Sequence, residues 1–310
     1  MKRAVVFGYG DVGVRCLATM LSHGFTVPLV VTHEDDPQET QWFSSMGQFA
    51  RDRDLPVTYG ERTMPEALLL QVRECQPDFI FSFYYRRMLP AQLLSIARHG
   101  AFNMHGSLLP KYRGRAPINW AILKGERQTG ATLHYMTEKP DAGAIIAQRA
   151  VPILPDDTAV DVFRKVCVTA EIILHESLPA IADGAIRSQP QDLSQGSYFG
   201  ARRPDDGVID WNLSARAVHD LVRAVAPPFP GARTVIDHRP ARILRTLHAN
   251  DVVSHHGHPT IFARDDRVYA ECGDGRVLRL LIVEIDGVES TAALIRQAQD
   301  HPIDLVGART

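Results

Sequence analysis

Short apolar segments alternate with amphipathic ones over the first third of the chain, and this alternation restricts the fold more than any other feature. The apolar segments have the length and composition of buried strands, and the segments between them have the apolar spacing of helices. Such a repeat predicts a mostly parallel sheet with helices on both faces. Because ligands of these sheets bind beyond the carboxyl ends of the strands, we expect a site where the last strand ends. The predicted strands are 4–7, 27–32, 78–83 and 101–105, and the predicted helices are 12–21, 43–53, 66–74 and 91–98.

The rest of the chain has a different pattern. Residues 106–117 are rich in glycine, proline and basic side chains, which predicts a loop. A strand pair at 129–136 and 144–150 surrounds a Pro-Asp-Ala-Gly turn, and apolar spacing predicts a long helix over 158–181. From about Gly231 onward, short apolar segments separated by turn residues predict a small β-barrel or sheet.

A chain of 310 residues is long for one compact core, so we expect two domains. The expected fold class is α/β, with a Rossmann-like, mostly parallel sheet followed by a small C-terminal β-barrel. The boundary is placed inside a polar segment at 189–207, which has the composition of a linker or surface loop. The predicted domains are therefore 1–203 and 204–310.

Composition narrows the classes of partner. The net charge is −2, without the basic excess of proteins that bind nucleic acid through its phosphates, so no nucleic-acid partner is expected. The four cysteines are scattered and form no CxxC, which fits a reducing compartment and predicts no zinc site. A histidine cluster at 255–258 has no acidic or cysteine partner, so no metal is expected. No apolar run has the length of a signal peptide or membrane span, which predicts a cytoplasmic protein without membrane contact.

A G-x-G-x-x-G pattern spans Gly8 to Gly13, between a predicted strand and a predicted helix. Glu34 and Asp35 follow the second strand, where an acid would meet a ribose, so an NAD-dependent oxidoreductase is one alternative. The same glycines also permit a tight strand-to-helix turn and close helix packing in any sheet of this class. We therefore expect no NAD.

Asn103 and His105 end the last strand of the parallel series. Because side chains alternate along a strand, both point to the same side. A carboxamide beside an imidazole can stabilise the oxyanion that forms when an acyl carbon is attacked. Asp141 lies in a turn that can bring a carboxylate to the histidine. No Ser or Cys nucleophile is indicated, since Ser107 has no evident base, so these residues indicate direct attack by the acceptor.

Three segments around these residues resemble the folate-dependent formyltransferases. That family carries N-x-H-x-S-L-L-P, then R-G-x-x-P and later D-x-G. This chain shows Asn103-Met-His-Gly-Ser-Leu-Leu-Pro110, Arg113-Gly-Arg-Ala-Pro117 and Asp141-Ala-Gly143. The resemblance covers nearly the whole chain and implies a Rossmann-like domain followed by an OB-like barrel. It also implies that Asn103, His105 and Asp141 are catalytic and that 10-formyltetrahydrofolate is the co-substrate.

The resemblance extends to the binding of both substrates. It places folate against segments 85–89, 109–111 and 135–141, whose backbone groups can hydrogen-bond a pterin. The folate-binding residues implied are Tyr85, Arg86, Arg87, Met88, Leu109, Lys111, Tyr135 and Pro140. A nucleotide diphosphate needs cations, since a guanidinium can hold a phosphate with two hydrogen bonds. We expect the substrate-binding residues to be Ser107, Arg115, Arg202 and Arg203.

A closer likeness within the family rests on segments 81–86, 105–120, 199–206 and 222–231. They resemble the formyltransferase domain of the bifunctional proteins of polymyxin resistance, which formylates UDP-4-amino-4-deoxy-L-arabinose for lipid A modification. Those proteins carry a further NAD-dependent decarboxylase domain, for which this chain has no room before Thr310, so a stand-alone version is expected. In the implied mechanism Asn103 is an oxyanion donor, and either His105 or Asp141 takes the proton of the amine.

Two other functions compete with a nucleotide-sugar substrate. A methionyl-tRNA formyltransferase would share the chemistry, but residues 32–39 are acidic where those enzymes carry a basic loop, and they would repel phosphates. A non-catalytic folate- or nucleotide-binding sensor would have no need of a histidine–aspartate pair that handles protons. The sequence therefore favours a small nucleotide-linked amino sugar as the partner.

Overall fold

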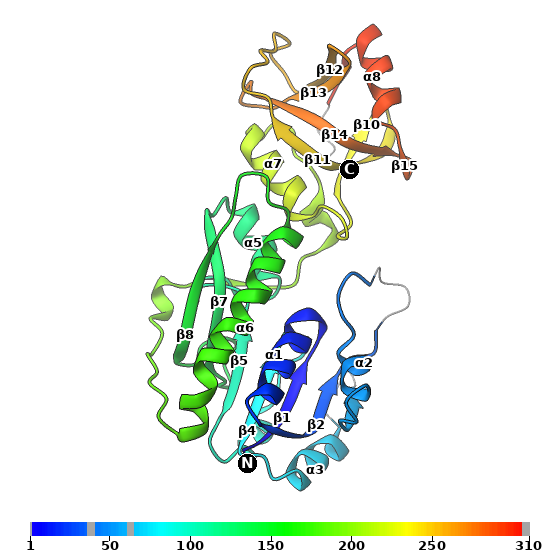
Figure 1. Cartoon of the computed structure of the whole chain (residues 1–310). Coiled ribbons are helices and arrows are strands. Elements are labelled where there is room, and N and C mark those ends of the chain that lie inside the picture. The colour runs from blue at the N-terminus through cyan, green and yellow to red at the C-terminus, as the bar shows by residue number, and fades with distance from the viewer. Residues whose placement is uncertain (1, 36–40, 61–64, 306–310) are drawn as a thin grey trace. The chain divides into compact units, whose positions relative to one another are not determined.

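The computed structural model describes residues 2–35, 41–60 and 65–305 and divides into two compact units (Figure 1). The first unit comprises residues 1–117, 128–152 and 163–200. The second comprises residues 118–127, 153–162 and 201–310. Two short segments that precede the expected boundary at 203 are thus grouped with the C-terminal part of the chain. Each unit is described by itself.

The first unit contains a seven-stranded sheet in the order β3-β2-β1-β4-β5-β7-β8. Neighbours from β3 through β5 are parallel, whereas β7 pairs antiparallel with both β5 and β8. The mostly parallel sheet predicted by the strand–helix repeat is confirmed. The strands are β1 (Arg3–Gly8), β2 (Thr26–Thr32), β3 (Val57–Tyr59), β4 (Phe79–Phe83), β5 (Ala101–His105), β7 (Gln128–Tyr135) and β8 (Ile145–Pro152).

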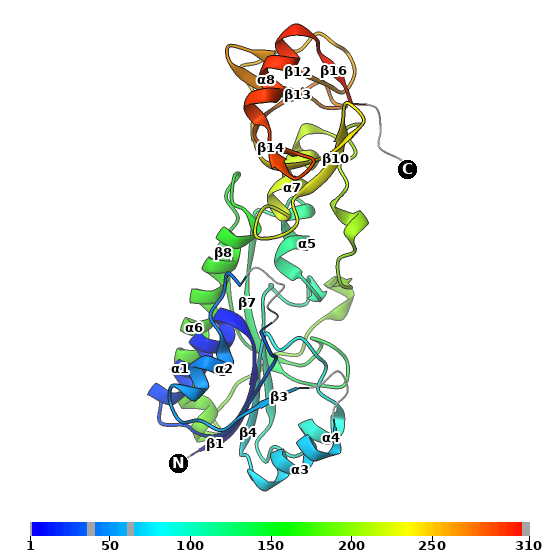
Figure 2. The same ribbon diagram turned by 90° about the vertical axis from the view of Figure 1, so that its right-hand side faces the viewer.

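Helices cover both faces of this sheet, as the sequence predicts. Figure 2 shows α1, α2 and α6 on one side of the sheet and α3 and α4 on the other. The central strands are buried on both faces, which is why they are continuous apolar runs in the sequence. The face toward α3 and α4 includes Val5, Phe7, Ile80 and Ala101, and the opposite face carries the rings of Phe79, Phe81 and Phe102. The helices are α1 (Gly10–Ser22), α2 (Met46–Arg51), α3 (Glu66–Glu74), α4 (Ala91–Leu94) and α6 (Ala159–Asp183).

The second unit is built on an antiparallel sheet in the order β10-β11-β14-β13-β12-β16. Its apolar core joins the sheet to α7 and α8 and includes the fully buried Trp211. The predicted C-terminal β domain is confirmed. Its strands are β10 (Ala232–Ile236), β11 (Arg239–His248), β12 (Thr260–Arg264), β13 (Arg267–Glu271), β14 (Val277–Ile285), β15 (Val288–Glu289) and β16 (Ile303–Asp304), and its helices are α5 (Pro117–Leu123), α7 (Ala215–Ala224) and α8 (Thr291–Asp300).

The polar segment at 189–207, expected to be a linker or surface loop, is partly ordered against the first unit. It contains the turn η1 (Leu193–Gln195) and the strand β9 (Tyr198–Phe199), and a second turn, η2 (Pro204–Gly207), follows in the second unit. β9 pairs in parallel with β6 (Arg113–Gly114), so the loop predicted after β5 is anchored as well. Composition alone could not predict this order, because it depends on hydrogen bonds to residues far away in the sequence.

Candidate active site

β5 places Asn103 and His105 on the sheet face that α3 and α4 cover elsewhere. Asn103 lies opposite Ser82 of β4 and opposite His134 of β7. Because directly paired residues of neighbouring antiparallel strands share a face, His134 joins the two predicted residues. His105 is 6% exposed and His134 is 2% exposed, so both imidazole rings are buried.

Asp141 reaches this face from the turn between β7 and β8. Its Oδ1 accepts from Asn103 Nδ2 at 3.3 Å and lies 3.5 Å from His105 Nδ1, while Oδ2 accepts from Gly114 N at 2.9 Å. Its φ is +50°, a left-handed conformation that Asp tolerates better than most residues. Gly143 is needed beside it, because a Cβ there would lie 1.9 Å from Tyr135 O. The D-x-G spacing thereby folds the turn back onto the strands.

The loop after β5 is fixed from within and presents its backbone to the histidine. Ser107 Oγ donates to Lys111 O at 2.7 Å, and Thr132 Oγ1 donates to Ser107 O at 2.6 Å. The carbonyl of Tyr112 then lies 2.8 Å from His105 Nε2. Ser107 is completely buried and its hydroxyl is engaged inside the loop, so its position gives no support to a contact with substrate.

The electrostatics of the pair follow from burial and from close partners. Burial alone raises the pKa of the Asp141 carboxyl, but His105, His134 and the amide of Gly114 together hold that pKa well below its usual range. Burial lowers the pKa of His105, and the neighbouring Asp141 carboxylate opposes this shift without reversing it. Near neutral pH the cluster therefore holds a carboxylate beside a neutral imidazole.

The tautomer of each histidine follows from its carbonyl partner. A carbonyl only accepts, so His105 carries its hydrogen on Nε2, facing Tyr112 O, and leaves the Nδ1 lone pair toward Asp141. His134 likewise carries its hydrogen on Nδ1, which lies 2.8 Å from Tyr135 O. His134 Nε2 then accepts from Asn103 Nδ2 at 3.1 Å. The amide of Asn103 thus donates one hydrogen to His134 and the other to Asp141.

Sequence reasoning missed His134. The available signal was its place in the predicted strand at 129–136, which brings it opposite Asn103 once the two strands are aligned. The register of β5 against β7 could not be predicted, because it depends on the path of the connection between them. That connection includes α5, a helix that was not predicted.

The loop after β4 holds the first group of residues expected at a folate. The guanidinium of Arg86 lies 4.3 Å from the ring centre of Tyr9, and Arg115 Nη2 donates to Arg86 O at 3.5 Å, so this loop borders the loop after β5. Nη1 of Arg87 is buried and has no hydrogen-bond partner among the described residues. Met88 is 57% exposed, and the ring of Tyr85 stacks on that of His33 at 4.3 Å.

The remaining folate candidates lie around the catalytic turn and the loop after β5. Leu109 is buried, Lys111 is exposed, and Pro140 immediately precedes Asp141. The ring of Tyr135 packs against Phe102 at 4.9 Å between centres, on the sheet face opposite Asn103. The structure therefore brings the backbone of Tyr135 to the cluster and turns its ring away.

The arginines expected to bind a diphosphate belong to different units. Arg115 is an exposed residue of the first unit. In the second unit, Arg202 Nη2 donates to Asp206 O at 2.8 Å and its guanidinium lies 5.8 Å from the ring centre of Trp120. Burial lowers the pKa of Arg202, and its Nε has no hydrogen-bond partner among the described residues. Arg203 is exposed, and its backbone N donates to Asp206 Oδ2 at 2.6 Å.

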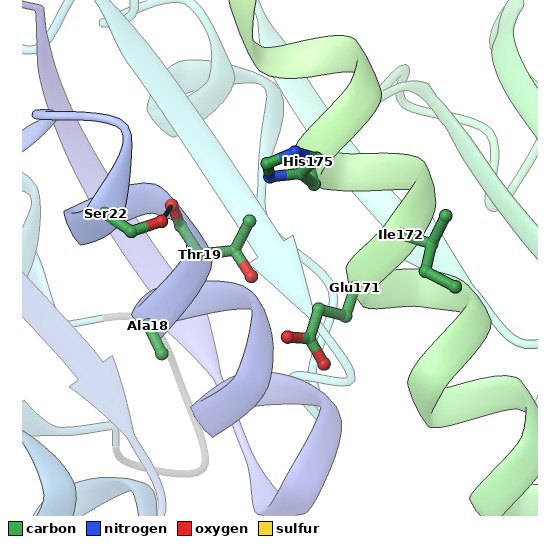
Figure 3. A pocket seen from close by; sticks show the side chains of 6 residues that line it. All are labelled: Ala18, Thr19, Ser22, Glu171, Ile172 and His175. Carbon is green, nitrogen blue, oxygen red and sulfur yellow. Dashed lines mark hydrogen bonds between the residues drawn. The ribbon is translucent and has the colours of Figure 1, made fainter.

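A surface pocket lies between α1 and α6 and includes none of the catalytic candidates (Figure 3). His175 Nδ1 lies 2.9 Å from His23 Nε2, and Glu171 pairs with Arg15 at 2.5 Å. Polar groups at this pocket are thus already engaged with neighbouring side chains. Its lining residues are Ala18, Thr19, Ser22, Glu171, Ile172 and His175.

The described ranges, 2–35, 41–60 and 65–305, hold no group of three or more His, Cys, Asp or Glu side chains that could bind a metal ion. No helix within them combines the length and the apolar content that a membrane crossing requires.

Two family models match the sequence. The model described as "Formyl transferase" matches residues 1–178, more than half of the chain, and includes Asn103, His105 and Asp141. The model described as "Formyl transferase, C-terminal domain" matches residues 202–294, within the β-rich second unit.

Solved structures share this fold at low sequence identity. An N-formyltransferase from Helicobacter canadensis, in complex with folinic acid and dTDP-3-aminofucose, is 22% identical with a TM-score of 0.73, and the match covers 90% of this chain and 99% of that one. WlaRD, a sugar 3N-formyl transferase crystallised with dTDP and 5-N-formyl-THF, is 21% identical with a TM-score of 0.72, covering 90% and 97%. HypX from Aquifex aeolicus, in complex with tetrahydrofolic acid, is 19% identical with a TM-score of 0.62, covering 94% of this chain and 46% of that one.

Proposed function

The chain belongs to the formyl transferase family, and we propose that it transfers the formyl group of 10-formyltetrahydrofolate to the amine of a nucleotide-linked amino sugar. The observation that carries this proposal is the cluster of Asn103, His105 and Asp141, which contains a proton-accepting pair and no enzyme nucleophile. The folds of the sugar formyltransferases described above, over nine-tenths of this chain, add support.

The proton balance of the reaction matches this pair. Formyl transfer forms a bond from the amine nitrogen to the formyl carbon and breaks the bond from that carbon to the folate nitrogen. The amine loses a proton and the folate nitrogen gains one. We assign the proton to His105 Nδ1, because the lowered pKa of Asp141 makes its carboxylate the weaker base. Asp141 then stabilises the imidazolium, which can donate the proton onward.

Asn103 serves the same step as an oxyanion donor in this proposal. Its amide nitrogen donates to His134 and Asp141 in the absence of substrate, so it must exchange one of these hydrogen bonds for the developing oxyanion. When His105 becomes an imidazolium, Asp141 gains a closer partner, and this exchange becomes easier. Proton transfer to His105 and release of the Asn103 amide are thereby coupled through one carboxylate.

The loops that border the cluster fit a folate. Polar groups around them include the buried Nη1 of Arg87, which has no hydrogen-bond partner among the described residues. The exposed Met88 offers apolar surface beside them. When bound, the folate supplies the activated formyl carbon, and these residues hold it in reach of Asn103 and His105.

For the acceptor we propose UDP-4-amino-4-deoxy-L-arabinose, and with it a cytoplasmic role in lipid A modification and polymyxin resistance. The support is the likeness of segments 81–86, 105–120, 199–206 and 222–231 to the enzymes that act on that sugar. In the first unit, Arg115 is the proposed ligand of the diphosphate. A methionyl-tRNA substrate is disfavoured by the acidic segment after β2, of which residues 36–39 lie outside the described part of the chain.

The proposed function is tested by mixing the protein with 10-formyltetrahydrofolate and an amine and following tetrahydrofolate by absorbance. We expect turnover with UDP-4-amino-4-deoxy-L-arabinose and an N-formylated sugar as product by mass spectrometry. Turnover with methionyl-tRNA alone would move the chain to the other substrate class. Turnover with dTDP-linked amino sugars in preference to the UDP sugar would keep the reaction and replace the sugar.

A further inference from the structure

Residues 189–199, which we name the strap, run along the catalytic turn and the loop after β5. At one end of the strap, the backbone of Gln189 pairs with that of Ile145. At its other end, Arg113 N donates to Ser197 O at 3.0 Å and Arg115 N donates to Phe199 O at 2.9 Å. The strap therefore contacts both backbone segments that hold the histidine–aspartate pair.

Gln191 is the strap residue that binds the catalytic turn through its side chain. Its Nε2 donates to Asp141 O at 3.0 Å and to Gly143 O at 2.6 Å, so both amide hydrogens close the same turn. Its Oε1 is buried and has no hydrogen-bond partner among the described residues. A buried acceptor without a partner is unfavourable, so the carboxamide is poorly suited to a purely stabilising role.

The turn needs an external brace because its backbone is strained at the catalytic residue. Asp141 has φ +50°, a conformation that is sparsely populated for residues other than glycine and persists where the surroundings hold it. Gly143 sits so close to Tyr135 O that the turn has little freedom on that side. Gln191 closes the opposite side by holding the carbonyls at both ends of the Asp141–Gly143 segment.

We propose that Gln191 is a positioning residue for formyl transfer, which fixes the Asp141 carboxylate beside His105 Nδ1. The inference rests on the proposed function, because it assigns a role in that same proton transfer. Displacing a reacting group by about 1 Å can cost on the order of a hundredfold in rate. The distance from Asp141 Oδ1 to His105 Nδ1, 3.5 Å, leaves little tolerance before the pair separates.

Gln191→Met tests the role, because methionine has nearly the same shape and donates no hydrogen bond. We expect kcat to fall by about tenfold to a hundredfold, with KM for both substrates within about twofold of wild type. Gln191→Asn keeps the amide but shortens the side chain by one methylene, so its kcat should lie between that of wild type and that of Gln191→Met. The matched control is Gln189→Met, the same exchange at an exposed strap residue, whose kcat should equal that of wild type.

A second readout does not depend on turnover. The groups facing His105 are Asp141, His134 and the carbonyl of Tyr112, and the carboxylate is the one that raises the pKa of His105 most. An NMR titration of the His105 ring should therefore show a lower pKa in Gln191→Met than in wild type or Gln189→Met. General destabilisation of the fold would lower the melting temperature without this selective change.

Two results would overturn the positioning role: kcat of Gln191→Met within twofold of wild type, or a loss of kcat with the His105 titration unchanged. Wild-type protein that releases no tetrahydrofolate with any amino sugar would instead contradict the proposed function. In that case the titration alone decides the inference, since it measures where the Asp141 carboxylate lies.

Discussion

Each unit contains a buried histidine and an aspartate with close charged or polar partners, and the hydrogen bonds of these side chains differ between the units. In the second unit, His219 Nδ1 bonds Thr246 Oγ1 at 2.8 Å and Nε2 bonds Pro155 O at 3.1 Å. A hydroxyl can donate and a carbonyl can accept, so the neutral ring is satisfied on both sides. In the first unit, the neutral ring of His105 is satisfied at Nε2 but turns its Nδ1 lone pair toward the carboxylate of Asp141.

Asp220 of the second unit and Asp141 of the first unit also differ in how their negative charge is balanced. Arg223 donates to Asp220 Oδ1 through Nε at 2.8 Å and lies 2.7 Å from it through Nη2, which neutralises the charge permanently. Asp141 accepts hydrogen bonds from Asn103 and Gly114 and lies 3.5 Å from His105 Nδ1 and 3.6 Å from His134 Nε2, so its charge is balanced only when a histidine is protonated. Burial and residue type therefore do not distinguish a structural cluster from a reactive one, whereas the arrangement of hydrogen-bond donors and acceptors does.

Removing the charge of Asp141 is the strongest way to test this contrast. Asp141→Asn keeps the size of the side chain but cannot stabilise an imidazolium, so kcat should fall by about 10²–10⁴-fold. Circular dichroism should show that the fold is retained. Near-normal turnover in this variant would mean that the first cluster, like the second, is structural.

Breaking the second cluster should have the opposite outcome. Arg223→Met leaves the Asp220 carboxylate buried and unpaired, which should reduce the free energy of unfolding by about 3–5 kcal/mol. Denaturant unfolding measures this loss, and kcat of the remaining folded protein should stay within about twofold of wild type. A large loss of kcat without a loss of stability would remove the distinction between the clusters.

Within the first cluster, the role of Asn103 as an oxyanion donor can be tested separately. Asn103→Ala removes the proposed oxyanion donor and one partner of Asp141, so kcat should fall by about 10²–10³-fold. KM for the amine should change little, because the interaction forms in the transition state. Equal changes in KM and kcat would assign Asn103 to substrate binding.

The arginines extend the same contrast to substrate binding. Arg223 is buried against a carboxylate, whereas Arg115 is exposed and its Nη2 donates to the carbonyl of Arg86. A guanidinium bonded only to a neutral group remains able to bind a phosphate, so Arg115→Ala should raise KM for the nucleotide sugar by about tenfold. Arg149→Ala is the matched control, since Arg149 is exposed and pairs with Glu176 at 2.9 Å. An unchanged KM would exclude Arg115 from the diphosphate site.

The smallest expected effect is on stability at acid pH. Burial lowers the pKa of His219, so the folded state binds fewer protons than the unfolded state below the unfolded pKa of about 6.5. This histidine therefore favours folding least at low pH, and stability falls as pH decreases below about 6.5. His219→Gln should flatten that slope in melting temperature against pH. A slope identical to that of wild type would show that the ring of His219 is not kept neutral by the fold.

Much of the first unit could be predicted because its signals are local. Strand alternation placed Asn103 and His105 on one face, and the D-x-G pattern identified the turn that carries Asp141. Gln191 could not be found this way, since its contact with Asp141 joins residues 50 positions apart. His134 required the register of β5 against β7, which depends on the length and path of the chain between them.

Other elements could not be predicted because their sequences are polar. α7 was not predicted because its arginines, histidine and aspartate are polar in the sequence, yet Arg223 and Asp220 are buried as partners of each other, and His219 is buried with Thr246 and Pro155 as its partners. Residues 189–207, which include the strap, were predicted from their polar composition to be a linker or surface loop, and the sequence did not indicate that the strap's backbone hydrogen bonds order the loop after β5. Sequence patterns identify apolar faces, whereas these elements depend on polar groups that find partners far along the chain.

The most direct test of the account is the rate of tetrahydrofolate release by wild type and His105→Gln, with 10-formyltetrahydrofolate and UDP-4-amino-4-deoxy-L-arabinose at neutral pH. The account predicts turnover by the wild type, one N-formylated sugar per tetrahydrofolate, and a rate in the variant lower by about 10²–10⁴-fold. A variant that turns over at the wild-type rate would contradict the assignment of the proton to His105.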